Sequence, residues 1–534
     1  MRELLLSVGY NNWILPVLLA VPLLGALLVA FTGRRGAEGE DEVVSGVARG
    51  PWLLTTAVFA IEFVLSLGLW WAFDPKFEGW QQAFNVPWIP SWGIRFTLAL
   101  DGISLMMVLL TTFIMLLASY GSFTSIRRKA RAYYALLLVL TTGMLGVFMA
   151  LDLFLFYVMW EAMLIPMYFI VGIWGGERRI YASLKFFIYT MVGSLLMLVG
   201  IVYLGVHQPP TVVNGVVQQI PNFSYAAALT TAQFTPTAAY WLFGAFFLAF
   251  AVKVPMFPLH TWLPDAHVEA PTAGSVVLAS IMLKLGTYGF LRLAVPLFPT
   301  AAMDPRVRTA VLVLAVIGIV YGALVSLVQP DFKKLVAYSS VSHLGFVMLG
   351  IFALTVQSVQ GALMVMINHG LSTGALFFLI GMIYERRHTR MIDAYGGIAR
   401  VVPLFAALLT FVSLSSIAVP GTNGFIGEFL VLVGSFRTAP VLTLIATTSV
   451  IIAAAYLLWA IQRILFNPLD KPENAHVSDL NRRELLLMAP LIAGIIWMGV
   501  YPAPILRRME VSAAHFVRLV ESRSAARTAF DGRR

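Results

Sequence analysis

The sequence AVKVPMFP at residues 251–258 interrupts a long apolar segment with one lysine and two prolines. A second apolar segment is interrupted by VPGTNG at residues 419–424. Proline removes a backbone donor and clashes with the preceding turn, so we expect a helix to break at each stretch. Backbone groups freed at membrane depth are tolerated only inside protein or beside water. The two stretches therefore predict two broken helices whose interruptions can reach water.

Two such helices in the two halves of a chain are typical of an inverted-repeat transporter core. The interruptions are about 165 residues apart, which fits one broken helix in each repeat. The simpler alternative is a pair of ordinary proline kinks in a helical bundle.

Composition identifies the class of protein. Of 534 residues, 59% are hydrophobic and only 12% are charged, and the mean hydropathy is +0.85. A soluble domain has roughly 25% charged residues, so the chain is expected to lie in a membrane. The absence of cysteine excludes cysteine-ligated iron–sulfur clusters, thiol catalysis and disulfides. The net charge of +10 lies in short runs between apolar segments, which indicates membrane topology and no nucleic-acid partner.

Apolar segments of spanning length predict an all-α polytopic membrane protein with about 14 transmembrane helices. The first of them is long enough to span, and no small-residue cleavage site follows it, so we expect no signal peptide. The candidate spans are 12–32, 52–73, 98–122, 131–150, 152–174, 184–205, 240–262, 274–296, 308–328, 334–354, 358–384, 402–432, 440–466 and 484–503. We divide the chain into 1–130 with spans 1–3, 131–300 as the first inverted repeat, 301–470 as the second, and 471–534 with the last span and a basic tail.

Basic residues concentrate in the odd-numbered loops between spans, including the loops at 34–49, 127–131 and 386–400. The positive-inside rule then places these loops in the cytoplasm, and an even number of spans places both termini on the periplasmic side of a bacterial inner membrane. The arginine-rich tail beyond residue 506 does not follow this pattern.

Ionisable residues inside the spans are the candidate functional groups. A charge at the bilayer centre costs roughly 2.5–3.5 kcal/mol on insertion scales, so several of them in one chain indicate a function. The candidates are Glu62, Glu161, Lys253, Lys284, His343, His369 and Glu428.

Three of these residues suggest proton loading. Glu161 lies half-way through an apolar span, although it could be a hydrogen-bonded structural carboxylate. Lys253 precedes the first break, and Lys284 lies in a span beside glycines. Burial favours the neutral form of a lysine, which lets it load and release protons near neutral pH, and a nearby carboxylate opposes this.

The remaining residues are relays or carriers in this hypothesis. His343 and His369 have serine and asparagine neighbours and can pass protons, since histidine titrates near neutral pH. Each could instead be a core histidine, or the two could ligate a haem. Glu428 follows the second break and gains access to water there. Glu62 lies outside both repeats and has no assigned role. The polar stretch 260–271 lacks metal-ligand spacing, and its prolines argue against a continuous helix.

Several motifs resemble the antiporter-like subunits of respiratory complex I. They are LDGIS at 100–104, Trp160-Glu161, AVKVP at 251–255, the loop 259–275, LKLG at 283–286, YSS at 338–340 with SHLG at 342–345, NHG at 368–370, and PG at 420–421 with FIGE at 425–428. One branch of the family is favoured because Glu428 stands where the L and N subunits and Mrp-type subunits typically carry lysine. The arginine-rich stretch 384–390 and the absence of a long lateral helix after the last span also fit that branch.

The resemblance implies the role of each residue. Glu161 would modulate Lys253, the loading lysine of the first broken helix; Lys284 and His343, with His369 alongside, would form a central axis; Glu428 would be the terminal carrier. It also implies an H⁺-translocating NADH:quinone oxidoreductase in which this chain holds no cofactor. NADH, FMN, iron–sulfur clusters and quinone would belong to partner subunits, and the L and N subunits would be neighbours. Two alternatives are a subunit of a Mrp-type cation/proton antiporter or membrane-bound hydrogenase, and a membrane cytochrome.

Overall fold

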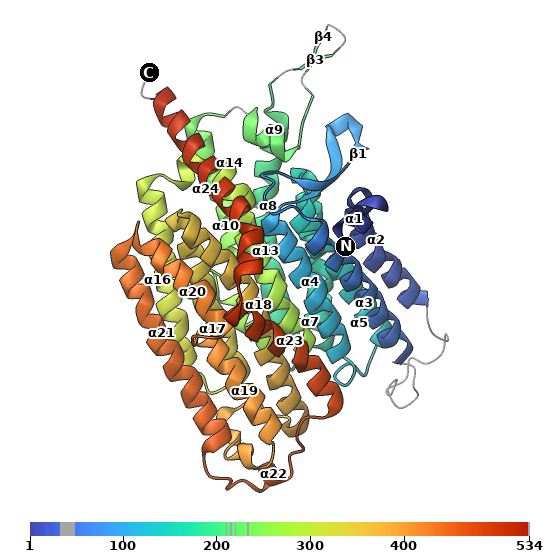
Figure 1. The fold of residues 1–534 in the computed structure, drawn as a ribbon, viewed down its shortest axis with the longest axis vertical. Coiled ribbons are helices and arrows are strands. Elements are labelled where there is room, and N and C mark those ends of the chain that lie inside the picture. The colour runs from blue at the N-terminus through green and yellow to red at the C-terminus, as the bar shows by residue number, and fades with distance from the viewer. Residues whose placement is uncertain (32–48, 210, 214–215, 219, 232–233, 532–534) are drawn as a thin grey trace.

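The computed structural model describes residues 1–31, 49–209, 211–213, 216–218, 220–231 and 234–531. In this part of the chain, 13 helices are long and apolar enough to cross a membrane, and they form one bundle (Figure 1). The predicted all-α polytopic fold is therefore confirmed, and two shorter apolar helices make up the remaining crossing. The basic loop residues Arg34 and Arg35 lie outside the described residues.

Ten crossings are single α-helices. They are α2 (Tyr10–Phe31), α3 (Arg49–Ala72), α4 (Gly102–Gly121), α5 (Ala130–Met149), α8 (Arg179–Val206), α16 (Pro305–Leu327), α17 (Phe332–Ala353), α18 (Val356–Arg387), α21 (Pro440–Ile461) and α23 (Arg482–Val500). The α21 helix continues into the π-helical segment η6 (Gln462–Phe466).

Four crossings are interrupted. They are α6 (Leu153–Ala162) with α7 (Leu164–Trp174), α10 (Pro236–Lys253) with α11 (Trp262–Glu269), the series α12 (Thr272–Val277), η2 (Leu278–Met282), α13 (Leu283–Gly289), η3 (Phe290–Ala294) and α14 (Val295–Leu297), and α19 (Pro403–Ser416) with α20 (Asn423–Phe436). The short helices are α1 (Arg2–Ser7), α9 (Tyr225–Thr230), α15 (Pro299–Ala302), α22 (Pro472–Ala475), η1 (Pro90–Trp92), η4 (Ile392–Ala394) and η5 (Ile398–Arg400).

The two predicted breaks are where the sequence places them. Helix α10 ends at Lys253, just before Pro255, and the indole nitrogen of Trp262 donates a hydrogen bond of 2.9 Å to the carbonyl of Val252. Helix α19 ends at Ser416, and α20 begins after a loop in which Gly421 has a φ of 91°. Glycine adopts this left-handed conformation without a steric penalty. The hydrogen bond from Trp262 therefore satisfies one carbonyl at the first break, and Gly421 allows the turn at the second.

The two broken helices run in opposite directions. The chain enters α10 from the end of the bundle that carries α9, and enters α19 from the opposite end, near α22 (Figure 1). This is the relation that an inverted repeat requires. The span at 272–297 and helix α18 are wholly buried over their most apolar windows, whereas only 28% of the α21 window is buried. The span at 272–297 and α18 therefore form the centre of the bundle, and α21 lies at its periphery.

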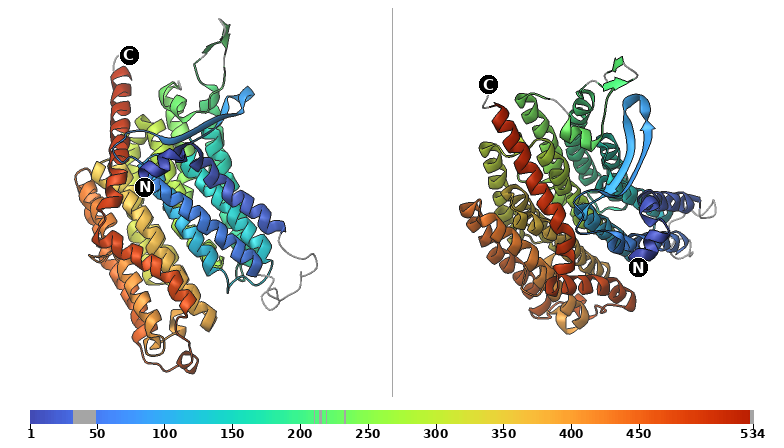
Figure 2. Two further views of the ribbon diagram at one scale, coloured as in Figure 1. Left: turned by 45° about the vertical axis from the view of Figure 1, so that its right-hand side comes forward. Right: turned by 45° about the horizontal axis from the view of Figure 1, so that its top comes forward.

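One end of the bundle, which we call the hairpin face, carries β1 (Gln81–Ile89) paired antiparallel with β2 (Ile94–Leu100) and the long helix α24 (Ala503–Asp531). Figure 2 shows the hairpin and α24 on this same face. A second small hairpin, β3 (Thr211–Val213) with β4 (Val216–Gln218), also lies there. The sequence did not predict β1 and β2, because the aromatic and proline residues around them are equally typical of an interfacial loop.

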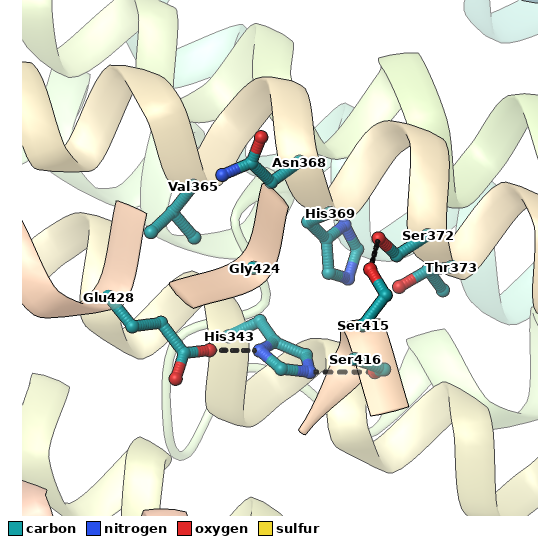
Figure 3. Close-up of a pocket in the computed structure, with 10 residues that line it drawn as sticks. All are labelled: His343, Val365, Asn368, His369, Ser372, Thr373, Ser415, Ser416, Gly424 and Glu428. Atoms are coloured by element: carbon teal, nitrogen blue, oxygen red, sulfur yellow. Dashed lines mark hydrogen bonds and ion pairs between the residues drawn. The ribbon is translucent and has the colours of Figure 1, made fainter. Parts of the chain in front are cut away.

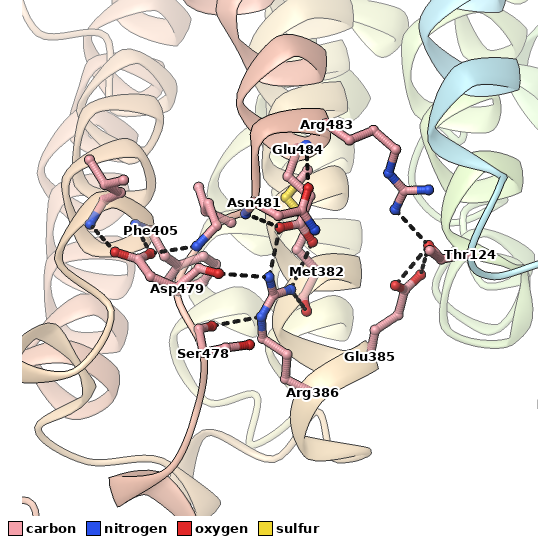
Figure 4. A network of polar contacts seen from close by, with 12 residues as sticks. Thr124, Met382, Glu385, Arg386, Phe405, Ser478, Asp479, Asn481, Arg483 and Glu484 are labelled. Carbon is pink, nitrogen blue, oxygen red and sulfur yellow. Dashed lines mark hydrogen bonds and ion pairs between the residues drawn. The ribbon is translucent and has the colours of Figure 1, made fainter.

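The opposite end, which we call the arginine-rich face, is held together by ion pairs. Arg386 at the end of α18 donates two hydrogen bonds, of 2.8 and 2.6 Å, to Glu484 in the first turn of α23 (Figure 4). Asn481 and Glu484 form a capping box at the start of α23. Beside them, Arg483 and Glu385 both bond to the hydroxyl of Thr124. These contacts join α18, α23 and the α4–α5 loop.

Candidate functional site

A buried hydrogen-bonded pair joins the second broken helix to α17. Glu428, in α20, places Oε1 2.8 Å from Nδ1 of His343. Each residue is only 8% exposed. On the other side of the imidazole, the Ser416 hydroxyl lies 3.4 Å from Nε2 (Figure 3). Glu428 and His343 can therefore exchange a proton directly.

A second buried pair joins the central span to α18. The ammonium of Lys284 lies 2.6 Å from Nδ1 of His369 and donates to the carbonyl of Ala279. Ala279 lies in η2, a π-helical segment. Such segments are frequent at functional sites because the wider turn leaves carbonyls free for other donors. Here the π turn supplies an acceptor for a lysine that is fully buried.

A small cavity lies between these two pairs. It has a volume of about 20 Å³ and is lined by both histidines, Glu428, and hydroxyl and amide side chains from α18 and α19 (Figure 3). The centres of the His343 and His369 rings are 5.5 Å apart. A cavity of roughly 10–15 Å³ is enough for one water, and a polar lining favours its occupancy. The space suits a water bridge between the imidazoles and is too small for a haem.

Polar side chains fix the break between α19 and α20. The Asn423 amide oxygen accepts hydrogen bonds from Ser415 at 2.6 Å and from Ser372 at 3.1 Å. The Asn368 side chain donates to the carbonyl of Asn423 at 2.5 Å. All four residues are buried. This network positions the first turn of α20, and with it Glu428, against α18.

Lys253 and Glu161 form a separate site at the first break. Lys253 is 1% exposed, and its ammonium has no hydrogen-bond partner among the described residues. It lies 5.6 Å from the ring centre of Trp160 and 5.2 Å from that of Phe186, within range of cation–π attraction. Glu161 is half-buried in the last turn of α6 and close enough for its charge to act on Lys253. The sequence did not predict the break that follows Glu161.

The structure brings together four of the six predicted residues, and we call Lys284, His369, His343 and Glu428 the central cluster. Their order differs in one respect from the predicted axis. His369 lies between Lys284 and the cavity rather than alongside, because the lysine bonds to His369 and the carboxylate bonds to His343. Lys253 and Glu161 have no hydrogen bond or ion pair with the central cluster in the described part of the chain.

Two buried residues near the arginine-rich face were not predicted. Lys333, in the first turn of α17, donates to the Ala270 carbonyl at 2.6 Å. His267 is fully buried, stacks on Phe377 with ring centres 4.7 Å apart, and has no described hydrogen-bond partner at either nitrogen. The sequence signal for Lys333 was present, but a lysine at a span end also fits a topology signal.

Three further features singled out in the sequence lie outside these two sites. Residues 262–269 form a continuous helix despite Pro264, because proline in the first turn is tolerated. No group of three or more His, Cys, Asp or Glu residues that could hold a metal is found among the described residues. Glu62 is fully buried, and neither of its oxygens has a partner in the described chain. Nothing in the structure gives Glu62 a role.

Comparisons with known proteins place the chain in a family. The family described as "NADH:quinone oxidoreductase/Mrp antiporter, TM" matches residues 150–453. The Rhodobacter capsulatus protein named NADH-quinone oxidoreductase subunit M is 44% identical, over 94% of this chain and 96% of its own. Marchantia polymorpha NADH-ubiquinone oxidoreductase chain 4 is 39% identical, over 95% of this chain and 97% of its own.

Solved structures agree with the sequence matches. A chain of respiratory complex I from Thermus thermophilus has a TM-score of 0.82 and 31% identity, covering 95% of this chain and 99% of that one. A chain of an archaeal membrane-bound sulfane sulfur reductase has a TM-score of 0.76 and 26% identity, over 93% of this chain and 77% of that one. The chain therefore belongs to the NADH:quinone oxidoreductase/Mrp antiporter family of membrane proteins. Within it, the full-length relatives named above are a subunit M and a chain 4, which agrees with the branch that Glu428 indicates.

Proposed function

We propose that this chain is the proton-translocating subunit M of the membrane arm of a NADH–quinone oxidoreductase. Electron transfer from NADH to quinone in partner subunits drives the proton movement. The observation that carries the proposal is the central cluster, a row of four ionisable side chains buried at the centre of a bundle of apolar helices. Such residues are expensive in a membrane and mark proton pathways.

The central cluster can pass a proton from Lys284 to Glu428 in successive transfers, in which each imidazole accepts one proton and releases another. The Lys284 ammonium gives a proton to Nδ1 of His369, which then releases one from Nε2 to a water in the cavity. That water gives a proton to Nε2 of His343, which passes one from Nδ1 to the Glu428 carboxylate. An imidazole can do this because it accepts on one nitrogen and donates from the other. Each step needs only the contacts of 2.6 and 2.8 Å and the cavity between the rings.

Glu161 and Lys253 act as a control element at the first break. Two opposite unit charges about 4 Å apart attract by roughly 4 kcal/mol at an effective dielectric of 20, and this pair, which forms no ion pair in the described chain, attracts by less. A rearrangement that moves Glu161 away from Lys253 therefore weakens the hold of the lysine on its proton. The aromatic surroundings of Lys253 leave Glu161 as its main counter-charge. Events in neighbouring subunits can reach the pump through this pair.

Partner subunits and a location in the membrane follow from this assignment. NADH, FMN, iron–sulfur clusters and quinone belong to other subunits, and the antiporter-like L and N subunits are neighbours in the membrane arm. The chain lies in a bacterial inner membrane with the arginine-rich face in the cytoplasm, by the positive-inside rule. The hairpin face and both termini are then periplasmic. A role in another family complex is the alternative, supported by the likeness to the sulfane sulfur reductase chain.

Purification of the native complex tests this assignment. A tag on this chain should co-purify subunits that oxidise NADH and reduce quinone, and the complex in vesicles should acidify one side during NADH oxidation. A tagged chain that co-purifies only Mrp-type antiporter subunits, or a hydrogenase, would establish the alternative instead.

A further inference from the structure

A column of polar side chains runs from the centre of the bundle to the hairpin face, outside the central cluster. Its first member is Tyr288, one helical turn beyond Lys284 in the central span. The Tyr288 hydroxyl donates to the Phe148 carbonyl at 2.9 Å and lies 2.8 Å from the Ser104 hydroxyl. Both hydroxyl residues are buried. A hydrogen-bonded pair of hydroxyl groups therefore lies directly on the hairpin side of the buried lysine.

The column continues through a buried ion pair. Asp101 caps α4 by accepting from the backbone nitrogens of Ile103 and Ser104, at 3.1 and 3.0 Å. The same Asp101 oxygen bonds to the Arg292 guanidinium. Arg292 lies one turn beyond Tyr288, and its guanidinium is 5.4 Å from the Tyr288 ring centre. The hydroxyl pair and the ion pair are thus neighbours at the start of α4.

A cavity connects the ion pair to the surface of the hairpin face. It has a volume of about 60 Å³, enough for more than one water, and its lining includes Asp101, Arg292 and Ser512. Glu78 and His515 also line it, and they are exposed and 2.6 Å apart. Helix α24 forms one wall, since the Ser512 hydroxyl accepts from the backbone nitrogen of Gly102 at 2.9 Å. The column therefore ends in a polar space whose mouth is at the surface.

We propose that Tyr288, Ser104 and this cavity form a second exit from Lys284, separate from the lateral path to Glu428, through which protons leave toward the hairpin face. The proposal rests on the proposed function. In the described conformation Lys284 bonds to His369 and Ala279 and not to Tyr288. The outlet is therefore closed until the flexible Lys284 side chain moves from His369 to Tyr288, which lies one helical turn further along the span. In the open state each hydroxyl gains one proton as it gives up another. The last proton passes by way of Asp101, which bonds to Arg292 and lines the cavity, to water there.

The first test compares two tyrosines. Tyr288→Phe removes the hydroxyl from the outlet, and Tyr133→Phe is the matched control. Tyr133 is also fully buried, and its hydroxyl lies 3.1 Å from that of Ser122, but near the arginine-rich face. In the intact complex reconstituted in vesicles, Tyr288→Phe should lose pumped protons per NADH while NADH oxidation continues, and Tyr133→Phe should pump as wild type. Equal pumping by both variants would overturn the outlet.

The second test blocks the cavity chemically. Because the chain has no cysteine, His515→Cys introduces the only thiol of this subunit, at an exposed position that lines the cavity. A membrane-impermeant thiol reagent added at the hairpin face should label it and lower the protons pumped per NADH. Ser522→Cys, exposed on the same helix outside the cavity lining, is the control that should be labelled without loss. Lack of labelling at His515→Cys, or labelling with unchanged pumping, would contradict the outlet.

The two proposals fail in distinguishable ways. If Lys284→Ala pumps normally, the central cluster does not carry protons and the proposed function is wrong. If Lys284→Ala stops pumping through this subunit while Tyr288→Phe and labelled His515→Cys pump normally, only the outlet is wrong.

Discussion

At the scale of single residues, two lysines of similar burial differ in the groups that surround them. Lys284 and Lys253 are both buried lysines in the middle of the bundle, yet Lys284 is bonded to a histidine and a carbonyl, whereas Lys253 faces aromatic rings. The first arrangement suits transfer of a proton to a neighbour, and the second suits a charge that responds to Glu161. We therefore propose different roles for the two lysines despite their similar burial.

Lys253→Ala should abolish most proton movement through this subunit while the complex still assembles, because the ammonium makes no described hydrogen bond that assembly would miss. Glu161→Ala should have the same effect by removing the controlling charge. Protons pumped per NADH by purified complex in vesicles give the measurement. Lys471→Ala, in a surface loop, serves as the control. Normal pumping by either pathway variant would refute the role assigned to it.

Glu428→Gln should impair pumping more than assembly, since glutamine keeps a hydrogen-bonding group beside His343 but cannot carry a proton. Glu428→Asp should restore part of the activity. The amount of assembled complex and the protons pumped per NADH should be measured together. Pumping at the wild-type level in Glu428→Gln would exclude this residue as a carrier.

Asp152 predicts a pH dependence at the hairpin face, outside the spans. Burial raises the pKa of its carboxyl to about 6, although backbone donors, including the nitrogen of Arg95, act in the opposite direction. The folded chain then binds a proton here more tightly than the unfolded chain does. Stability from this group is therefore gained as the pH falls through 6 and is lost above it.

Asp152→Asn should remove this titration while the side-chain oxygen still caps α6. The thermal unfolding temperature of wild type should rise relative to that of the variant as the pH is lowered from 8 to 5. The carboxyl contributes at most about 3 kcal/mol to this difference. Parallel pH profiles for the two proteins would show that Asp152 does not titrate in this range.

At the scale of helices, the interruptions position the charged groups. Close packing at small residues keeps the interrupted helices in place against their neighbours. A Cβ added at Gly427 would lie 2.8 Å from the backbone nitrogen and the side chain of Val365 in α18. Helix α20 therefore approaches α18 closely just before Glu428. The same principle applies at Gly286, where an added Cβ would lie 2.9 Å from backbone atoms at the end of α10.

Gly427→Ala should push α20 away from α18 and disturb the contact between Glu428 and His343. Overpacking of this kind typically costs about 1–3 kcal/mol. The complex should inactivate at a lower temperature and pump fewer protons per NADH. Gly318→Ala is the matched control, because an added Cβ in α16 meets nothing within 4 Å. Equal thermal stability of the two variants would contradict the packing argument.

Much of the arrangement of the helices could be predicted from the sequence. Proline at residues 255 and 420 determines both breaks, and the chemistry of the interrupted backbone predicts charged residues nearby. The kink after Glu161 could not be predicted, because Pro166 is compatible with a helix that continues. The pairing of Lys284 with His369, and of His343 with Glu428, also depends on tertiary packing, which places residues 85 positions apart side by side.

At the scale of the molecule, the bundle has two unlike ends and a buried polar centre. The arginine-rich face is held by ion pairs such as Arg386 with Glu484, and the hairpin face by strands and by α24. The broken helices enter from opposite ends, so each face has its own interrupted helix (Figure 1). The sequence predicted this inverted arrangement, but it contained no clear signal for the hairpin or α24. The division at residues 130, 300 and 470 stays a prediction.

The central claim is that the central cluster carries protons across the bundle. The most direct measurement is the number of protons pumped per NADH by the purified complex in vesicles, with wild type compared with Lys284→Ala. We predict that NADH oxidation continues in the variant while fewer protons are pumped for each NADH. A wild-type number of protons pumped per NADH in Lys284→Ala would contradict it.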